Sequence, residues 1–206
     1  MTIQDQIAAH RIVPVVVLDD AKDAAPLAQA LVDGGLPVAE VTFRTAAAAE
    51  SIKIMAERGD ILVGAGTVLT PAQVDAAVEA GAKYVVSPGT STAVVKRAQE
   101  RGVLPLPGAV TATEVMNVLE LGLDIVKFFP AGTSGGLPAI KALAAPFGGV
   151  KFIPTGGISA SNLQEYLSVP AILAVGGSWM VPKSLVNEGK FDQIAELCRD
   201  AVALAK

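Results

Sequence analysis

The chain has almost none of the side chains on which many hydrolases and metalloenzymes rely. Its 206 residues include one histidine, His10, and one cysteine, Cys198. A single cysteine excludes an intramolecular disulfide, and this pair cannot assemble a zinc site from its usual ligands. Ser-His-Asp and Cys-His mechanisms lack a base, because His10 precedes the first predicted strand and no other imidazole exists. Catalytic chemistry must therefore come from lysine, glutamate, aspartate or arginine.

Basic residues and long hydrophobic runs are scarce as well. Sixteen Lys and Arg against twenty Asp and Glu give a formal net charge of −4, which provides no basic stripe for a nucleic-acid backbone. Hydrophobic runs stop far short of the roughly 20 residues of a membrane-spanning helix. Residues 1–11 carry an acid and amide side chains where a secretory signal would be basic and then apolar. We therefore expect a cytoplasmic protein that binds neither nucleic acid nor membrane.

Hydrophobic residues are plentiful, at 51% of the chain, and their spacing predicts the fold. Short β-branched runs alternate with helical patterns, and no linker interrupts them. Eight such units favour an α/β protein, a single (β/α)8 TIM barrel domain over residues 1–206, with a short extra N-terminal helix at Thr2 to His10. A doubly wound open sheet is the alternative, disfavoured because no G-x-G-x-x-G fingerprint follows the first strand. The predicted strands are Ile12 to Leu18, Val38 to Phe43, Ile61 to Gly64, Tyr84 to Ser87, Leu104 to Leu106, Ile125 to Phe129, Phe152 to Thr155 and Ile172 to Val175.

Two helix starts and one helix face are also predicted from local patterns. Thr70-Pro71-Ala72-Gln73 and Thr111-Ala112-Thr113-Glu114 are typical of capping boxes. In the last predicted helix Cys198 lies on an apolar stripe at helical spacing, so we expect it in the core and not as a nucleophile.

The second predicted strand carries charge on one face. Side chains alternate along a strand, so Glu40, Thr42 and Arg44 share one face while Val41 and Phe43 share the other. The outward face of a barrel is buried under helices, which suits the two apolar residues and turns Glu40 and Arg44 toward the barrel mouth. Active sites of barrels lie at this end of the strands. A buried structural ion pair is the alternative, although two enclosed charges are destabilising unless both are satisfied.

The sixth predicted strand places Lys127 in the middle of an apolar run. Desolvation disfavours the charged ammonium form, which makes a neutral amine available to attack a carbonyl. The alternative is a lysine that reaches the barrel end and neutralises a carboxylate there. Lys151 also lies near a strand, but at its start, which predicts a solvated charge at the opposite end of the barrel. Lys127 is therefore the candidate nucleophile.

Glycine pairs follow the last two predicted strands. Gly156-Gly157 follows the seventh, and Gly176-Gly177 follows the eighth and precedes Ser178. Glycines let backbone N–H groups approach an anion, and the loops after strands seven and eight are the usual phosphate site of a barrel. Either pair alone is also typical of an ordinary turn. Thr67, after the third strand, is a candidate ligand contact at the same mouth.

Six short motifs carry a resemblance to a known family. They are Glu40-Val41-Thr42-Phe43-Arg44-Thr45, Gly64-Ala65-Gly66-Thr67-Val68, Ser87-Pro88-Gly89, Lys127-Phe128-Phe129-Pro130-Ala131, Pro154-Thr155-Gly156-Gly157-Ile158 and Gly176-Gly177-Ser178-Trp179. In this order the chain resembles, from end to end, the class I aldolases of 2-keto-3-deoxy-6-phosphogluconate (KDPG) and 4-hydroxy-2-ketoglutarate (KHG). Phe43 departs from the family, where leucine is common, and so does Gly132-Thr133, where an acidic residue is common. The second departure bears on substrate preference.

The resemblance implies an aldolase that cleaves 2-dehydro-3-deoxy-6-phosphogluconate, a keto-deoxy sugar acid phosphate, to pyruvate and glyceraldehyde 3-phosphate. It extends to cleavage of 4-hydroxy-2-oxoglutarate to pyruvate and glyoxylate. It further implies a homotrimer that needs no metal and no organic cofactor. The implied site residues are Lys127 as the Schiff-base lysine, Glu40 for proton transfer, Arg44 and Thr67 for the pyruvate carboxylate, and Gly156, Gly157, Gly177 and Ser178 for the phosphate.

Three other functions fit parts of the pattern. An aldolase for the galactonate epimer would use the same lysine, glutamate and arginine. A phosphosugar isomerase would share the phosphate loops but would not need an amine in an apolar strand. A non-catalytic sugar-phosphate sensor would leave Glu40, Arg44 and Lys127 without a purpose.

Overall fold

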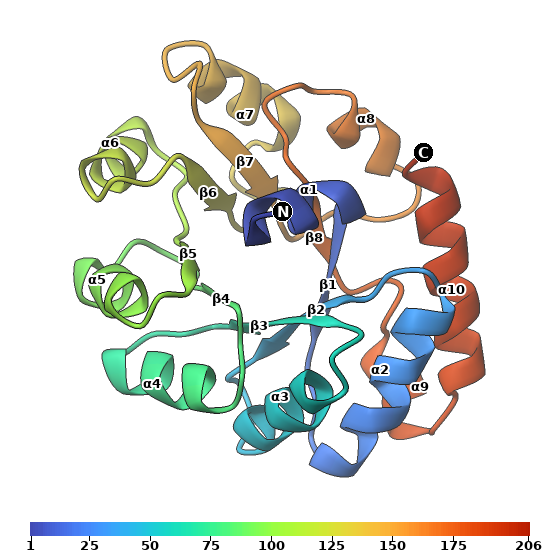
Figure 1. Ribbon diagram of the computed structural model, residues 1–206. Coiled ribbons are helices and arrows are strands. Elements are labelled where there is room, and N and C mark those ends of the chain that lie inside the picture. The colour runs from blue at the N-terminus through green and yellow to red at the C-terminus, as the bar shows by residue number, and fades with distance from the viewer.

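The computed structural model describes residues 1–206 as parallel strands that alternate with helices (Figure 1). The strands are β1 Ile12–Val16, β2 Val38–Thr42, β3 Leu62–Gly66, β4 Tyr84–Val86, β5 Leu104–Leu106, β6 Ile125–Phe128, β7 Lys151–Pro154 and β8 Val175–Gly177. The helices are α1 Ile3–His10, α2 Ala24–Asp33, α3 Ala48–Glu57, α4 Pro71–Glu79, α5 Thr92–Glu100, α6 Ala112–Glu120, α7 Gly136–Ala144, α8 Leu163–Leu167, α9 Lys183–Asn187 and α10 Phe191–Leu204, with a 3₁₀ turn η1 at Ala21–Asp23. No helix is long and apolar enough to cross a membrane.

The strands form two parallel sheets. Six strands pair in the order β5-β4-β3-β2-β1-β8, and β6 pairs with β7. Isolated bridges span the two gaps between these sheets: Gly108 to Lys127 between β5 and β6, and Phe152 to Ile172 and Thr155 to Gly176 between β7 and β8. The prediction of a parallel α/β architecture is confirmed, and its ladders divide into two sheets connected by isolated bridges.

The predicted bounds of the last strand were wrong. Val175, Gly176 and Gly177 pair with β1, in register with Ile12, Val13 and Pro14, whereas Ile172 makes only an isolated bridge to Phe152. Ladder pairing uses backbone groups alone, so the glycine pair that marked a loop in the sequence extends the strand instead. Gly177 is therefore the last residue of β8 and does not lie in the loop that follows it.

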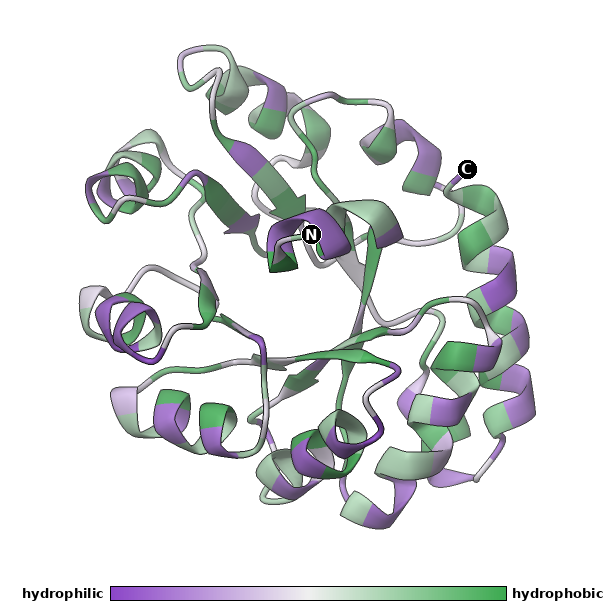
Figure 2. Ribbon diagram, viewed as in Figure 1, coloured by the Kyte–Doolittle hydropathy of each residue, from purple (hydrophilic) through white to green (hydrophobic).

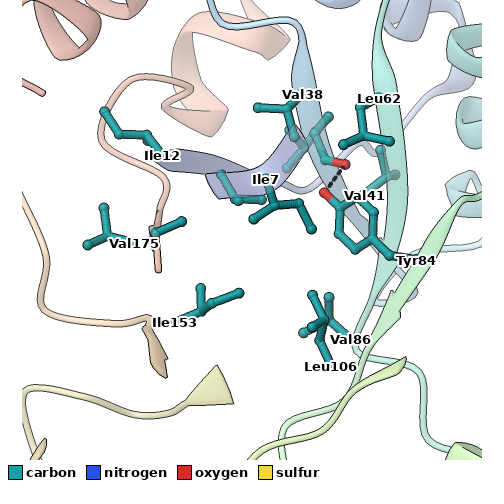
Figure 3. Packing of buried hydrophobic residues seen from close by; sticks show 14 of the residues in the cluster. Ile7, Ile12, Val38, Val41, Leu62, Tyr84, Val86, Leu106, Ile153 and Val175 are labelled. Carbon is teal, nitrogen blue, oxygen red and sulfur yellow. Dashed lines mark hydrogen bonds between the residues drawn. The ribbon is translucent and has the colours of Figure 1, made fainter. Parts of the chain in front are cut away.

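The interior is apolar on both faces of the strands. Hydropathy colouring shows green strands and helices that are green toward the strands and purple outside (Figure 2). Val38, Leu62 and Tyr84 pack in the interior between the strands (Figure 3). Parallel strands covered by helices are buried on both sides, which explains their almost continuous hydrophobic sequence. Each such side chain contributes about 1.5–3 kcal/mol when it is fully buried.

The last helix packs as its apolar stripe predicted. Ile194, Cys198 and Ala201 of α10 are buried, and α10 packs against α2. Burial raises the pKa of the Cys198 thiol to about 12, so the thiolate needed for nucleophilic chemistry is scarce at neutral pH. The prediction that Cys198 is a core residue is confirmed.

A short helix covers the ends of the strands where they begin. Thr2 and Asp5 form a capping box at the start of α1, and Arg11 ends the helix with a left-handed φ of 61°. The Arg11 guanidinium donates hydrogen bonds to Ala205 O at 2.7 Å and Leu167 O at 3.1 Å, at the C-terminal ends of α10 and α8. A cation is favourable there because the last carbonyls of a helix carry partial negative charge. Arg11 thus ties α1 to two helices distant in sequence.

The two predicted capping boxes differ in outcome. Thr111 and Glu114 form the complete reciprocal box at the start of α6. At α4, Thr70 Oγ1 accepts from the Gln73 N–H, but the Gln73 side chain accepts from the Leu69 N–H at 2.7 Å. The capping box at α4 is therefore half formed, because the Gln73 side chain accepts from the residue before the N-cap and not from the N-cap itself.

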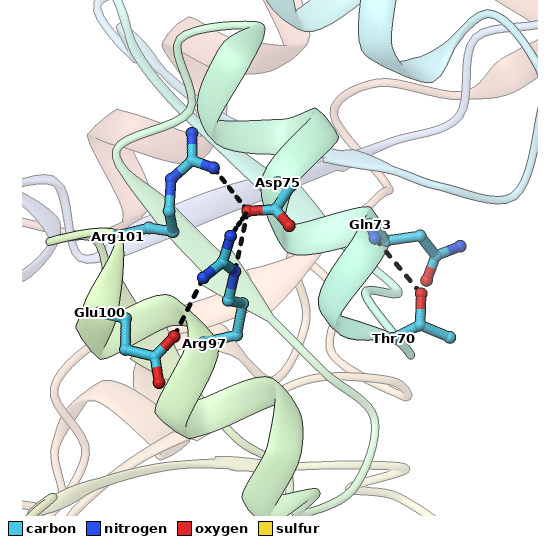
Figure 4. Close-up of polar contacts among 6 residues, drawn as sticks. All are labelled: Thr70, Gln73, Asp75, Arg97, Glu100 and Arg101. Carbon is cyan, nitrogen blue, oxygen red and sulfur yellow. Dashed lines mark hydrogen bonds and ion pairs between the residues drawn. The ribbon is translucent and has the colours of Figure 1, made fainter.

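Asp75 of α4 forms ion pairs with Arg97 of α5 and with Arg101, the C-cap residue of α5 (Figure 4). Hydrogen bonds and charge from Arg97, with further help from Arg101, hold the pKa of the Asp75 carboxyl below its ordinary value of 3.8. A depressed folded-state pKa contributes stability that is present above the ordinary value and is lost as pH falls through the folded value.

We expect Asp75→Asn to lower Tm by a few degrees at most at pH 7, because this pair is partly exposed. The difference from the unsubstituted protein should shrink as pH falls below about 4 and through the lowered folded-state pKa of Asp75. Thermal unfolding followed by circular dichroism at several pH values measures it. Asp200→Asn is the matched control, since Asp200 makes none of the ion pairs. A constant difference down to pH 2 would contradict the prediction.

Candidate active site

Glu40 and Lys127 meet in the interior, between the strands of the two sheets. Lys127 Nζ lies 3.0 Å from Glu40 Oε1, and the two residues are only 5% and 3% exposed. Glu40 comes from β2 in the six-stranded sheet and Lys127 from β6 in the two-stranded sheet, so the contact crosses the interior. Two buried charges are tolerated when each satisfies the other. The carboxylate that Lys127 contacts is therefore Glu40, and the alternative of a Glu40–Arg44 ion pair is wrong.

Two glycines of β3 make room for this arrangement. A Cβ on Gly66 would lie 2.3 Å from Glu40 Oε1, and one on Gly64 would lie 2.2 Å from the Tyr84 ring. Alternation along β3 puts both glycines on its inner face, so the carboxylate and the ring occupy the space that two side chains would fill. The predicted third strand ended at Gly64, whereas β3 continues to Gly66.

Tyr84 fixes the strand beside Glu40. Its hydroxyl donates a 2.8 Å hydrogen bond to the carbonyl of Ala39 (Figure 3). Burial, and then the Glu40 charge, raise the Tyr84 pKa well above its ordinary value, so the phenol stays a neutral donor. Tyr84 was not identified from the sequence, because a tyrosine in a predicted strand is ordinary.

A small chamber surrounds the pair; we call it the inner cavity. It measures about 10 Å³, the space of one water molecule at most. Its lining residues are Val13, Glu40, Tyr84, Val86, Leu106, Lys127, Ile153 and Thr155.

Thr155 is the second residue that the sequence did not identify. Its hydroxyl is buried and has no hydrogen-bond partner, and it lines the inner cavity beside Lys127. An unpaired buried hydroxyl is destabilising unless water or a ligand completes it. Phe129 is a third such residue, with its ring centroid 5.3 Å from Lys127 Nζ.

Arg44 and Thr67 are brought together at the ends of β2 and β3. Arg44 Nε donates a 3.2 Å hydrogen bond to Thr67 Oγ1. The guanidinium is otherwise exposed, so its remaining donors face solvent. Thr67 has a left-handed φ of 55°, a conformation that is uncommon for a β-branched residue and is enriched at ligand sites.

The predicted phosphate residues lie at the ends of β7 and β8. Gly156 and Gly157 have φ values of 90° and 82°, which few residues other than glycine adopt. Their N–H groups donate no hydrogen bond within the protein. The bridge from Thr155 to Gly176 brings this loop next to the end of β8.

Gly177 and Ser178 have different surroundings. A Cβ on Gly177 would lie 1.9 Å from Trp179 Cζ3, so this glycine accommodates a tryptophan ring and is itself buried. Ser178 is exposed and lines a second chamber of about 160 Å³, which we call the outer cavity. Its lining residues are Val15, Val17, Arg44, Ser178, Val181, Pro182 and Lys183.

The end of the molecule where the strands begin contains none of the predicted site residues. A cavity of about 390 Å³ lies there beside α1, lined in part by Gln6, His10 and Lys83. Lys151 is the first residue of β7, and its Nζ donates a 2.9 Å hydrogen bond to Pro170 O, as expected for a lysine away from the site. No group of three or more His, Cys, Asp or Glu is placed to hold a metal ion.

Known proteins match almost the whole chain. The family described as KDPG and KHG aldolase matches residues 3–197. A 2-dehydro-3-deoxy-phosphogluconate aldolase of Treponema pallidum is 47% identical over 205 residues, covering 99% of this chain and 98% of that one. A KHG/KDPG aldolase of Escherichia coli is 46% identical, with 95% and 92% covered. A solved KDPG aldolase of Legionella pneumophila, with pyruvate captured at low pH as a covalent carbinolamine intermediate, superposes with a TM-score of 0.92 at 41% identity, covering 95% and 96%.

Proposed function

Because this chain belongs to the KDPG and KHG aldolase family, we propose that Lys127 is the nucleophile of its class I reaction. The protein is a 2-dehydro-3-deoxy-phosphogluconate aldolase, a carbon–carbon lyase that acts through a Schiff base and releases pyruvate. The observation that carries the residue assignment is the buried contact between Lys127 Nζ and Glu40 Oε1. An amine and a proton acceptor at hydrogen-bond distance are the two groups that iminium chemistry requires.

Lys127 and Glu40 have consecutive tasks in this mechanism. Glu40 accepts the ammonium proton, and the free amine adds to the C2 ketone to give a carbinolamine. Glu40 returns that proton to the carbinolamine hydroxyl, which leaves as water, and the resulting iminium accepts the electron pair when the C3–C4 bond breaks. Glu40 takes the proton of the C4 hydroxyl as the aldehyde leaves, and it returns a proton to C3 of the enamine. Hydrolysis of the resulting iminium releases pyruvate and restores the amine.

Arg44 and Thr67 are proposed to bind the substrate carboxylate. The guanidinium keeps free donors after its bond to Thr67, and its planar fork matches a carboxylate as an ammonium cannot. Thr155 presents its unpartnered hydroxyl to the inner cavity, so we assign it a hydrogen bond to the adduct on Lys127.

The phosphate is proposed to lie over the ends of β7 and β8. Gly156 and Gly157 offer free N–H groups, and Ser178 offers an exposed hydroxyl; both are suited to a phosphate oxygen. Gly177 would act from within β8, by admitting the Trp179 ring and so leaving Ser178 at the surface.

We also propose four broader features of the protein. Residues 1–206 would form one domain whose strands close into a (β/α)8 barrel, which the three isolated bridges between the sheets support. Activity on 4-hydroxy-2-oxoglutarate is supported by the dual name of the Escherichia coli relative. A cytoplasmic location is supported by the charge and hydropathy patterns of the sequence, and a homotrimer by the resemblance to the family.

We expect the phosphorylated substrate to be cleaved with a kcat/KM at least roughly 100-fold above that of unphosphorylated 2-dehydro-3-deoxygluconate, since each charge-assisted hydrogen bond to phosphate contributes about 1.5–3 kcal/mol. Binding energy from this remote group supports reaction at the cleaved bond. Pyruvate release, followed with lactate dehydrogenase and NADH, measures both substrates. Equal kcat/KM values for the two substrates would contradict the proposed phosphate site, and a failure to release pyruvate from either substrate would overturn the proposed function.

A further inference from the structure

The outer cavity contains a lysine that the phosphate site described above does not include. Lys183 begins α9 and lines this cavity together with Arg44 and Ser178. The other four lining residues are aliphatic or proline. Three polar side chains therefore converge on one chamber, Arg44 from the end of β2 and the other two from the stretch between β8 and α9, and two of the three are cations.

The outer cavity lies directly above the inner one. Val13 lines the inner cavity, and Val15 and Val17 line the outer cavity. These three residues share one face of β1 and its extension, since strand side chains alternate. Two residues along a strand advance about 7 Å, a distance comparable to the length of a six-carbon chain. A substrate bonded to Lys127 would thus extend along β1 toward Ser178 and Lys183.

The charge of the outer cavity favours an anion. Lys183 Nζ lies 2.8 Å from Asp19 Oδ1, and both side chains are about half exposed, at 50% and 48%. Arg44 has no carboxylate partner within the protein and is assigned to the substrate carboxylate, which leaves Lys183 as the cation for a second anion. The Asn187 amide also donates to Asp19, at 3.4 Å, so Asp19 keeps a partner when Lys183 turns away from it.

We propose that Lys183 is the cation of the phosphate site and determines the preference for phosphorylated substrate; this inference rests on the proposed function. An exposed ion pair contributes little net free energy, so a phosphate dianion competes with Asp19 for the ammonium. Ser178 and the loop glycines then bind the phosphate oxygens by hydrogen bonds, and Lys183 adds the charge that they lack. Because α9 begins at Lys183, this residue is held close to the end of β8.

The test compares Lys183→Gln with the unsubstituted protein on both substrates. Lys183→Gln should lower kcat/KM for the phosphorylated substrate about tenfold or more, mainly through KM, and leave the unphosphorylated substrate unchanged. Inhibition by inorganic phosphate should weaken by a similar factor. Lys190→Gln is the matched control, since Lys190 is 48% exposed and paired with Glu188 outside the cavity. Asp19→Asn, which frees Lys183, should strengthen phosphate inhibition.

The outcomes separate the two proposals. If the unsubstituted protein discriminates between the substrates and Lys183→Gln discriminates equally well, Lys183 has no part in the site and the proposed function stands. An equal loss on both substrates would also overturn the inference, because it would indicate general damage. If the unsubstituted protein cleaves neither substrate, the proposed function itself fails. Trapping of pyruvate by borohydride should be unaffected in Lys183→Gln, since pyruvate carries no phosphate.

Discussion

Lys127→Arg and Lys127→Ala should both lose turnover and fail to gain mass after treatment with pyruvate and borohydride. The amine is the covalent centre, and nothing else in the inner cavity can form an iminium. The arginine variant is the sharper test, because a guanidinium can still pair with Glu40 and preserve the fold but is not a nucleophile. The alanine variant leaves a buried carboxylate unpaired and should also unfold more easily.

Intact-mass spectrometry of each variant, beside circular dichroism to establish folding, provides the measurement. Lys151→Ala is the control and should keep full activity, since Lys151 lies at the start of β7 with its Nζ on a backbone carbonyl. An adduct and cleavage activity in folded Lys127→Ala would show that the nucleophile lies elsewhere, and Lys151 would then be the next candidate.

Glu40→Gln should fail differently, because the carboxylate moves protons around the covalent centre without joining it. General acid–base catalysis contributes about 10²–10⁴-fold, and we expect a loss of kcat of that size. The amide is almost the same size, so it fits the space that Gly66 leaves. The variant should still accumulate a borohydride-trapped pyruvate adduct if water replaces the carboxylate in imine formation.

Trapping and turnover measured on the same Glu40→Gln sample distinguish these roles. Full turnover would show that another group transfers the protons. Thr42→Val provides a neighbouring control, since the Thr42 hydroxyl bonds Val16 O and lies outside the inner cavity. This control should retain most of its activity.

The sequence identified both members of the central pair but not their contact. Lys127 was a charge in an apolar run, and Glu40 lay on the polar face of an alternating strand. Their meeting depends on β2 and β6 facing each other across the interior, over a separation of 87 residues. Local periodicity carries no information on such distances, so the sequence left the partner of Glu40 open.

The errors came mostly from glycine. The third strand was predicted to end at Gly64, but β3 continues to Gly66, and these two glycines leave room for Tyr84 and Glu40. The glycine pair after Val175 suggested a loop but continues β8. A glycine is required wherever another group approaches the backbone closely, but a glycine in the sequence does not identify that group. Thr155 could not be identified from the sequence, because what distinguishes it is a buried hydroxyl with no hydrogen-bond partner, which only the structure shows.

The central pair also lies across the division between the two sheets. Glu40 belongs to the six-stranded sheet and Lys127 to the pair β6 and β7, and three isolated bridges connect the sheets, one of them made by Lys127 itself. Any small slip of one sheet against the other therefore changes the distance between amine and carboxylate directly. Local openings of a native protein cost less free energy than global unfolding. The catalytic rate should consequently depend on the alignment of the two sheets. A change in that alignment would lower the rate without changing the helical content of the protein.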